Sequence, residues 1–185
     1  MTYAFSEDSQ LLLDATLSVL SQDEGINNVL EIGCGSGEVL IRLYKRFPEI
    51  KFTGADISDK ALDSARDKFQ KKRVKIRLIK SDLFSNISNK FDLIIFNPPY
   101  LPNDKEFRDN CLHGGPKGNE TSIKFLKQAV NHLKNHGRII LLTSSLSHPE
   151  EILIEGRKLG FIIKKINEIR FFFEELATYL FIRTI

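Results

Sequence analysis

The sequence contains no tryptophan, one methionine and two cysteines among its 185 residues. Cys34 and Cys111 form no CxxC pair and have no metal-ligand spacing to any of the four histidines, so we predict no metal site. Two isolated cysteines are typical of free thiols in a reducing compartment. We therefore expect a cytoplasmic protein.

Long hydrophobic runs are also missing. No apolar run approaches the roughly 18 to 20 residues that a membrane-spanning helix needs, and the first ten residues carry two acids and no basic residue, unlike a signal peptide. With only 11 glycines, six prolines and 42% hydrophobic residues, the composition is that of a globular protein. The net charge of +3 permits anionic partners without requiring them. The length predicts a single domain over residues 1–185, with no room for an appended recognition domain.

Short apolar runs alternate with helical patterns along the chain. This alternation predicts an α/β fold, a mostly parallel sheet with helices on both faces. We expect strands at about 29–32, 51–56, 74–79, 91–96, 138–143, 161–169 and 177–183, and helices from Ser6, after Gly37, after Ser58, over 123–136 and after Pro149. The last two strands are joined too closely for a parallel crossover, so we expect an antiparallel hairpin.

A glycine-rich turn, Gly33-Cys34-Gly35-Ser36-Gly37, follows Glu31 and the first predicted strand. Such a turn lets the backbone approach a ligand closely at the start of a helix, although a purely structural turn is the alternative. A dinucleotide-binding loop requires a further glycine at position 38, where this chain has Glu38. Because a carboxylate there would repel a pyrophosphate, the pattern favours a ligand without phosphates.

Two aspartates follow the next two predicted strands. Asp56 lies 19 residues after Gly37, where a carboxylate can accept both hydroxyls of a ribose, and Asp82 can accept a hydrogen bond from an adenine amino group. A helix cap shared with Ser58 and an ordinary turn aspartate are the alternatives. The coincidence of three features at consecutive strand ends favours a ligand site, since open α/β sheets bind ligands there.

This combination resembles the class I S-adenosylmethionine-dependent methyltransferases over nearly the whole chain. The resemblance implies a seven-stranded Rossmann-like sheet in the order 3-2-1-4-5-7-6, S-adenosylmethionine as cofactor and S-adenosylhomocysteine as product. The cofactor-binding residues that it implies are Glu31, Gly33, Gly35, Gly37, Asp56, Ile57, Asp82, Leu83 and Asn97.

The tetrapeptide Asn97-Pro98-Pro99-Tyr100 directly follows a buried apolar strand. Two prolines remove backbone donors and leave carbonyl acceptors, and Asn97 adds a side-chain carbonyl oxygen. A planar NH₂ group can donate to both the Asn97 oxygen and the Pro98 carbonyl, while Tyr100 stacks on it. A plain Asn-Pro turn is the alternative. We predict that these four residues are catalytic and act by positioning the nitrogen that receives the methyl.

This tetrapeptide resembles the motif of methyltransferases that act on amide or exocyclic nitrogen. Residues 3–14 are also similar to the amino-terminal segment of the archaeal and eukaryotic branch of HemK-related glutamine N5-methyltransferases, although Phe5 replaces the usual proline and Gln10 an apolar residue. The resemblance implies that Ser9 approaches the cofactor from the amino-terminal helix segment, residues 1–20. A capped helix that merely packs on the sheet is the alternative.

The long connection after the tetrapeptide, residues 97–118, is predicted to be a loop over the acceptor groove. Its stretch from His113 to Glu120 is similar to a Gly-Gly-x-x-Gly segment of that branch, and we interpret the glycines as allowing the loop to move. Charges between Leu101 and Gly118 are balanced, which does not favour a nucleic-acid partner.

Two surface features remain. Six of the ten residues from Lys71 to Lys80 are basic, which predicts either an edge strand protected by lysines or an anion-facing surface. The resemblance implies a small zinc-binding activator subunit along the third strand, Val74 to Ile79, and a basic edge would suit an acidic partner. For Phe171 to Phe173 we predict core packing under the glycine loop, with an exposed patch for a partner as the alternative.

Together these observations predict an S-adenosylmethionine-dependent N-methyltransferase. By resemblance, its substrate is the glutamine of the Gly-Gly-Gln loop of a translation termination factor. The alternative is a nucleic-acid amino-group methyltransferase that acts on DNA adenine N6 or ribosomal RNA guanine N2. A catalytically idle binding subunit is disfavoured by the intact Asp56, Asp82 and Asn97.

Overall fold

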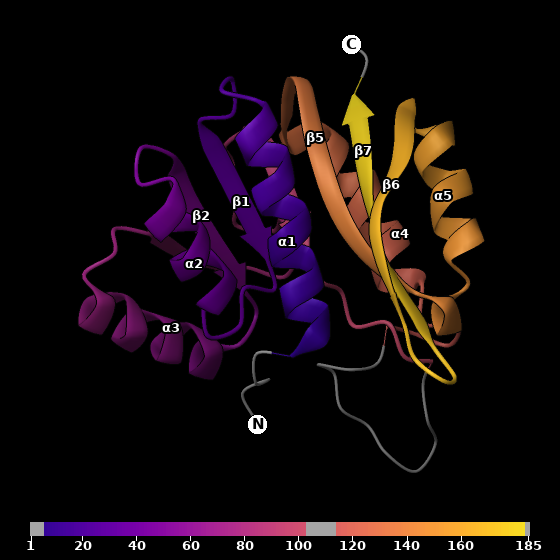
Figure 1. The fold of residues 1–185 in the computed structure, drawn as a ribbon, viewed down its shortest axis with the longest axis horizontal. Coiled ribbons are helices and arrows are strands. Elements are labelled where there is room, and N and C mark those ends of the chain that lie inside the picture. The colour runs from indigo at the N-terminus through magenta and orange to yellow at the C-terminus, as the bar shows by residue number, and fades with distance from the viewer. Residues whose placement is uncertain (1–5, 103–113, 184–185) are drawn as a thin grey trace.

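A computed structural model describes residues 6–102 and 114–183 and contains one seven-stranded sheet (Figure 1). The strand order is β3-β2-β1-β4-β5-β7-β6, with β1 to β5 parallel and β7 antiparallel to both β5 and β6. The strands are β1 (Asn28–Ile32), β2 (Lys51–Asp56), β3 (Arg77–Lys80), β4 (Phe91–Phe96), β5 (Leu133–Ser144), β6 (Phe161–Arg170) and β7 (Glu175–Arg183). The predicted order and the antiparallel final hairpin are confirmed.

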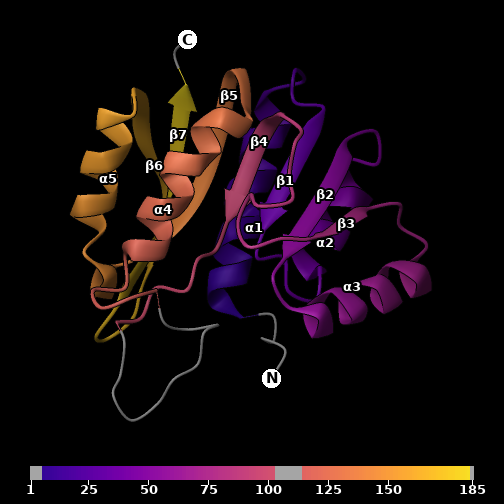
Figure 2. The same cartoon turned by 180° about the vertical axis from the view of Figure 1, so that it is seen from behind.

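Helices cover both faces of the sheet because the strand side chains alternate between two apolar cores. Val29 belongs to the core under α1 (Glu7–Gln22), α2 (Glu38–Arg46) and α3 (Asp59–Lys72), whereas Leu30 belongs to the core under α4 (Glu120–Ala129) and α5 (Pro149–Lys158). Figure 1 shows the α1 side and Figure 2 the α4 side. Short 3₁₀ turns, η1 (Val130–His132) and η2 (Ser145–Ser147), flank β5. Within the described ranges, every helix is too short or too polar to cross a membrane.

Two predicted boundaries are wrong. The helix expected over 123–136 ends at Ala129, because Leu133 already pairs with Phe91 of β4 and begins β5. The third strand begins at Arg77 and not at residue 74, because the backbone N–H of Val74 donates to Phe69 O as part of the carboxyl cap of α3.

The prediction of core packing for the three phenylalanines of the β6–β7 turn is also wrong. Phe172 and Phe173 are 90% and 84% exposed, and Phe171 is 42% exposed. Only the next apolar residue, Leu176, is buried, because it lies within β7 opposite Ser144 of β5.

Candidate active site

Three predicted site residues lie in one row at the carboxyl edge of the sheet. Ile32 of β1 pairs with Ala55 of β2 on one side and with Phe96 of β4 on the other. The residues that follow these three, Gly33, Asp56 and Asn97, therefore lie side by side at this edge, with Asp56 as the last residue of β2. Strand register alone thus brings the glycine turn, the ribose-binding candidate and the catalytic candidate together.

The glycine turn has a conformation that only glycine adopts easily. Gly33, Gly35 and Gly37 all have positive φ, of 63°, 54° and 74°. A Cβ on Gly37 would lie 2.4 Å from the ring of Phe69, so α3 packs directly against the turn. A Cβ on Gly35 would meet nothing within 4 Å. The first and last glycines are needed for the fold, and the middle one borders open space that a ligand can occupy.

Asp56 is held by the turn that it faces. Its Oδ2 accepts the backbone N–H of Gly35 at 2.8 Å, and its Oδ1 accepts that of Ser58 at 2.9 Å. Each carboxylate oxygen keeps a further lone pair, which can accept a hydrogen bond from a hydroxyl group. The side chain of Ile57 beside it is 65% exposed and offers an apolar surface to a flat ligand.

Glu31 is a buried carboxyl, only 4% exposed, on the α1 side of the sheet. Burial, and then the charge of Asp56, raise its pKa well above the usual value. Its Oε2 has no hydrogen-bond partner among the residues that the structure describes. A ligand cation at this position would supply the missing partner and stabilise the ionised carboxylate. Burial also raises the pKa of the neighbouring Cys34 thiol, which makes it a poor nucleophile.

Asp82 and Leu83 follow β3 at the same edge. Leu83 is left-handed, with φ of 49°, and its side chain is buried in the core on the α4 side. The exposed Asp82 accepts from Lys124 Nζ at 3.4 Å and borders an open hollow of about 330 Å³. Among the predicted cofactor contacts, Asp82 is thus exposed to solvent, whereas Glu31 is buried.

Asn97 has one half of its side-chain amide paired and the other half unpaired. Its Nδ2 donates to Asp8 Oδ2 at 2.9 Å, whereas its Oδ1 is buried and has no partner within the described part of the chain. A buried carbonyl oxygen without a donor is costly unless a ligand completes it. The geometry thus provides a vacant acceptor for one N–H of a bound NH₂ group.

The orientation of Asn97 depends on Asp8, a residue that the sequence analysis missed. Asp8 is 3% exposed, and its Oδ1 accepts the backbone N–H of Ser9 at 2.6 Å and the hydroxyl of Ser6. Ser6 occupies the cap position of α1, but its hydroxyl donates to Asp8 and accepts no backbone N–H of the helix. The only local signal was an acid in the first turn of an apolar helix, which ordinarily indicates the helix dipole. Ser9 lies in the same turn, beside this cluster.

The rest of the tetrapeptide is packed from two directions. Pro98 is buried, and Tyr100 packs against a small apolar cluster of Leu11, Leu142 and Leu176. On the other side, a Cβ on Gly114 would lie 2.3 Å from Pro99 O, and one on Gly118 would lie 2.4 Å from Tyr100 O. In the described part of this segment, glycine is therefore required by close backbone approach. Residues 103–113 of the predicted acceptor loop, with His113, lie outside the described residues.

Residues 6–160 match the family model of the methyltransferase small domain. A protein of Methanocaldococcus jannaschii, provisionally assigned as a protein N5-glutamine methyltransferase, is 36% identical, with 94% of this chain and 88% of the relative covered. The ribosomal RNA small subunit methyltransferase C of Haemophilus ducreyi is 32% identical over 88% of this chain and 45% of its own length. The release factor glutamine methyltransferase of Streptococcus pneumoniae is 37% identical, with coverage of 62% and 44%. The chain thus spans less than half the length of these last two relatives.

Solved structures share the fold. The Mtq2–Trm112 complex of E. cuniculi, described as responsible for methylation of the eRF1 translation termination factor, superimposes with a TM-score of 0.77 at 23% identity over 98% of both chains. The 16S rRNA N2 G1207 methyltransferase RsmC of T. thermophilus, solved with AdoMet and guanosine, has a TM-score of 0.69 at 19% identity over 96% of this chain and 43% of that chain.

Proposed function

The chain belongs to the methyltransferase small-domain family, as a HemK-related class I S-adenosylmethionine-dependent methyltransferase, and on that premise we propose that it methylates a side-chain amide nitrogen of a protein. The acceptor that we propose is the glutamine of the Gly-Gly-Gln loop of a translation termination factor. This substrate would place the reaction in the cytoplasm.

The residues at the glycine turn fit this cofactor. S-adenosylmethionine supplies an electrophilic methyl group on a positively charged sulfur. Asp56, with free lone pairs on both oxygens, would accept the ribose hydroxyls. Glu31, with its unpaired Oε2, would accept from the ammonium group, and the space above Gly35 leaves room for the chain between them. We assign the adenine contacts to Ile57, Asp82 and Leu83, and a further cofactor contact to Ser9.

The unpaired Oδ1 of Asn97 is the observation that carries the proposal. One hydrogen of the substrate NH₂ group would donate to this oxygen and the other to the Pro98 carbonyl, while Tyr100 supports the plane of the amide. Held by these two acceptors, the nitrogen would have its lone pair directed at the methyl group of a bound cofactor. The cofactor would supply the methyl and leave as S-adenosylhomocysteine, and the nitrogen would release one proton to water. No strong base is needed before transfer, because positioning lowers the barrier.

One observation supports a protein over a nucleic acid as substrate. The relative that this chain matches over 88% of the relative's own length is the one assigned to protein glutamine. The ribosomal RNA enzyme of Haemophilus ducreyi and the release factor enzyme of Streptococcus pneumoniae are both more than twice as long as the part matched here, so their lengths do not discriminate. The 32% identity to the Haemophilus ducreyi enzyme nevertheless makes guanine N2 of ribosomal RNA the second candidate.

We also propose a small zinc-binding activator subunit at the β3 edge of the sheet. β3 is one of the two outer strands of the sheet, and Arg77 and Lys80 at its two ends are exposed. An acidic partner strand could pair there through backbone hydrogen bonds. The solved Mtq2 structure is itself a complex with a small partner, Trm112.

The test is transfer of labelled methyl to three substrates in parallel: a termination factor, ribosomal RNA and duplex DNA, each with and without a candidate activator. The Asn97→Ala variant serves as the blank for contaminating activity. We expect label on the glutamine of the termination factor only. Label on RNA or DNA alone would overturn the proposed substrate.

A further inference from the structure

The turn between β6 and β7 presents an exposed aromatic surface, which we call the phenylalanine tip (residues 171–173). The rings of Phe172 and Phe173, 90% and 84% exposed, contact each other edge to face with their centroids 4.5 Å apart. Single exposed apolar residues need no explanation, but a contiguous exposed patch is typical of an interaction site.

The phenylalanine tip is held rigidly. The backbone N–H of Phe171 donates to Glu174 O at 2.7 Å and closes the turn. Ser144 Oγ donates to the Glu174 carboxylate at 2.6 Å, and Ser145 Oγ accepts the backbone N–H of Glu175 at 2.9 Å. The turn is thus tied to the end of β5. Because the backbone is already fixed, binding through the two rings would cost little conformational entropy.

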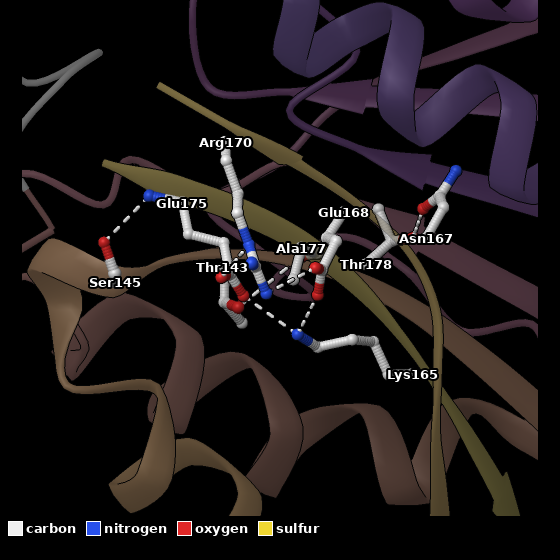
Figure 3. A network of polar contacts seen from close by, with 9 residues as sticks. All are labelled: Thr143, Ser145, Lys165, Asn167, Glu168, Arg170, Glu175, Ala177 and Thr178. Carbon is white, nitrogen blue, oxygen red and sulfur yellow. Dashed lines mark hydrogen bonds and ion pairs between the residues drawn. The ribbon is translucent and has the colours of Figure 1, made fainter. Parts of the chain in front are cut away.

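Charged residues of β6 and β7 next to the turn form a network of ion pairs between the two strands (Figure 3). Arg170 donates to Glu168 at 2.8 Å and to Glu175 at 3.1 Å, and Lys165 pairs with the same two glutamates. Residues 165–175 contain three glutamates and two basic residues, both of them paired. Nucleic-acid binding relies on basic side chains that meet phosphates. The charges here therefore favour a protein partner.

The phenylalanine tip lies on the same edge of the molecule as the candidate active site. Because β7 is antiparallel to the parallel strands, the β6–β7 turn lies at their carboxyl ends, on the lower side of Figure 1. Tyr100 packs in one apolar cluster with Ile169 and Leu176, the residues just before and just after the turn. The strand ends that carry the tip thus share one apolar cluster with Tyr100 of the acceptor tetrapeptide.

We propose that the phenylalanine tip is the docking surface for the body of the protein substrate, while the loop that carries the acceptor amide enters at Asn97. This inference rests on the proposed function and deepens it. A loop that projects from a folded domain brings the neighbouring surface of that domain with it, and exposed aromatic side chains are frequent anchors in such interfaces. The apolar tip would thus distinguish a folded substrate from a free peptide of the same sequence.

The test compares wild-type protein with the double variant F172S/F173S on two substrates, an intact termination factor and a short peptide that spans its Gly-Gly-Gln loop. We expect KM for the intact factor to rise about tenfold or more, with kcat retained and kinetics on the peptide unchanged. Ile162→Ser is the matched control, because Ile162 is a 53% exposed apolar residue near the other end of the same hairpin. We expect it to behave as wild type.

The outcomes separate this proposal from the proposed function. If wild-type protein binds the cofactor in calorimetry but methylates neither protein substrate, the proposed function fails and the docking surface with it. If it methylates both and the double variant has an unchanged KM for the intact factor, the docking proposal alone fails. An equal rise in KM for the short peptide would also overturn it. So would a wild-type protein that sediments as a dimer and a double variant that sediments as a monomer with an unchanged KM, because the tip would then join two copies of this chain.

Discussion

The two halves of the candidate active site are built in different ways. On the glycine-turn half, Asp56 accepts backbone N–H groups from residues 21 and two positions away in the sequence, and the strands concerned are neighbours. On the acceptor half, Asn97 is oriented by a residue 89 positions away, and Tyr100 packs against β7 at the end of the chain. The glycine-turn half, which would hold the cofactor and is called the cofactor half below, therefore depends on local turns. The acceptor half depends on how α1 and the β6–β7 hairpin pack against the rest of the protein.

This difference predicts that the two halves can fail separately. Removal of the Asn97 amide should leave most of the cofactor affinity intact, since Asn97 is one of several predicted cofactor contacts and its side chain bonds to Asp8 and not to the glycine turn. Removal of a cofactor-half group should weaken binding of S-adenosylmethionine without altering the arrangement of Asn97.

Asn97→Ala is expected to have the largest effect. It removes the Oδ1 that holds one hydrogen of the acceptor amide, and we expect kcat to fall about a hundredfold or more, as when a single preorganised hydrogen-bonding group is lost from an active site. Cofactor affinity in calorimetry should stay within about twofold of wild type. Asp56→Asn is the contrasting variant, with weakened cofactor affinity and kcat largely retained at saturating cofactor. Loss of cofactor binding in Asn97→Ala would contradict the separation of the two halves.

Asp8 gives a sharper test, because its two conservative replacements are expected to differ. In Asp8→Asn, the position that accepts from Ser9 N must stay an oxygen, so the new NH₂ group faces Asn97. Asn97 would then turn its Oδ1 toward residue 8 and its NH₂ group toward the substrate. Two hydrogen-bond donors would face each other there, so the substrate amide would lose its acceptor. In Asp8→Ala, Asn97 merely loses a constraint. We therefore expect kcat of Asp8→Asn to lie about tenfold below that of Asp8→Ala, although asparagine is the closer analogue.

The side-chain NH₂ resonances of Asn97, measured by NMR with bound cofactor, report its orientation independently of turnover. We expect them to be protected from exchange in wild type and not in Asp8→Ala. If Asp8→Asn retains more activity than Asp8→Ala, the orientation argument is wrong and Asp8 only supports the helix.

The placement of Gly33, Asp56 and Asn97 beside one another was predictable from sequence, because parallel strands end at one edge of a sheet. The hydrogen bond from Asn97 to Asp8 was not predictable, because nothing in the local sequence pattern specifies where the first turn of α1 packs. The exposed Phe172 and Phe173 were assigned to the core because hydrophobicity was the only signal. The geometry of their turn is set by hydrogen bonds to Ser144 at the end of β5 and to Ser145 of η2.

Substitution of Glu31 is expected to have the smallest effect. It tests whether the buried carboxylate lowers the stability of the free protein while it strengthens cofactor binding. Burial and the charge of Asp56 raise the pKa of Glu31 in the folded state. The folded protein therefore binds this proton more tightly than the unfolded chain does. The resulting contribution to the free energy of unfolding is complete below the unfolded pKa of about 4.3 and is lost as the pH rises through the folded pKa.

Glu31→Gln cannot ionise, so it should escape this loss. We expect its Tm to match that of wild type near pH 4 and to exceed it increasingly toward pH 8. Glu49→Gln makes the same replacement at an exposed site and is the control for it. The same variant should bind S-adenosylmethionine more weakly, because the ammonium group loses a carboxylate partner. A higher Tm without any loss of cofactor affinity would show that ionised Glu31 only destabilises the fold and is not part of the cofactor site. Both changes together would identify the buried carboxylate as a group whose unfavourable ionisation in the free protein is relieved when the cofactor's cation arrives.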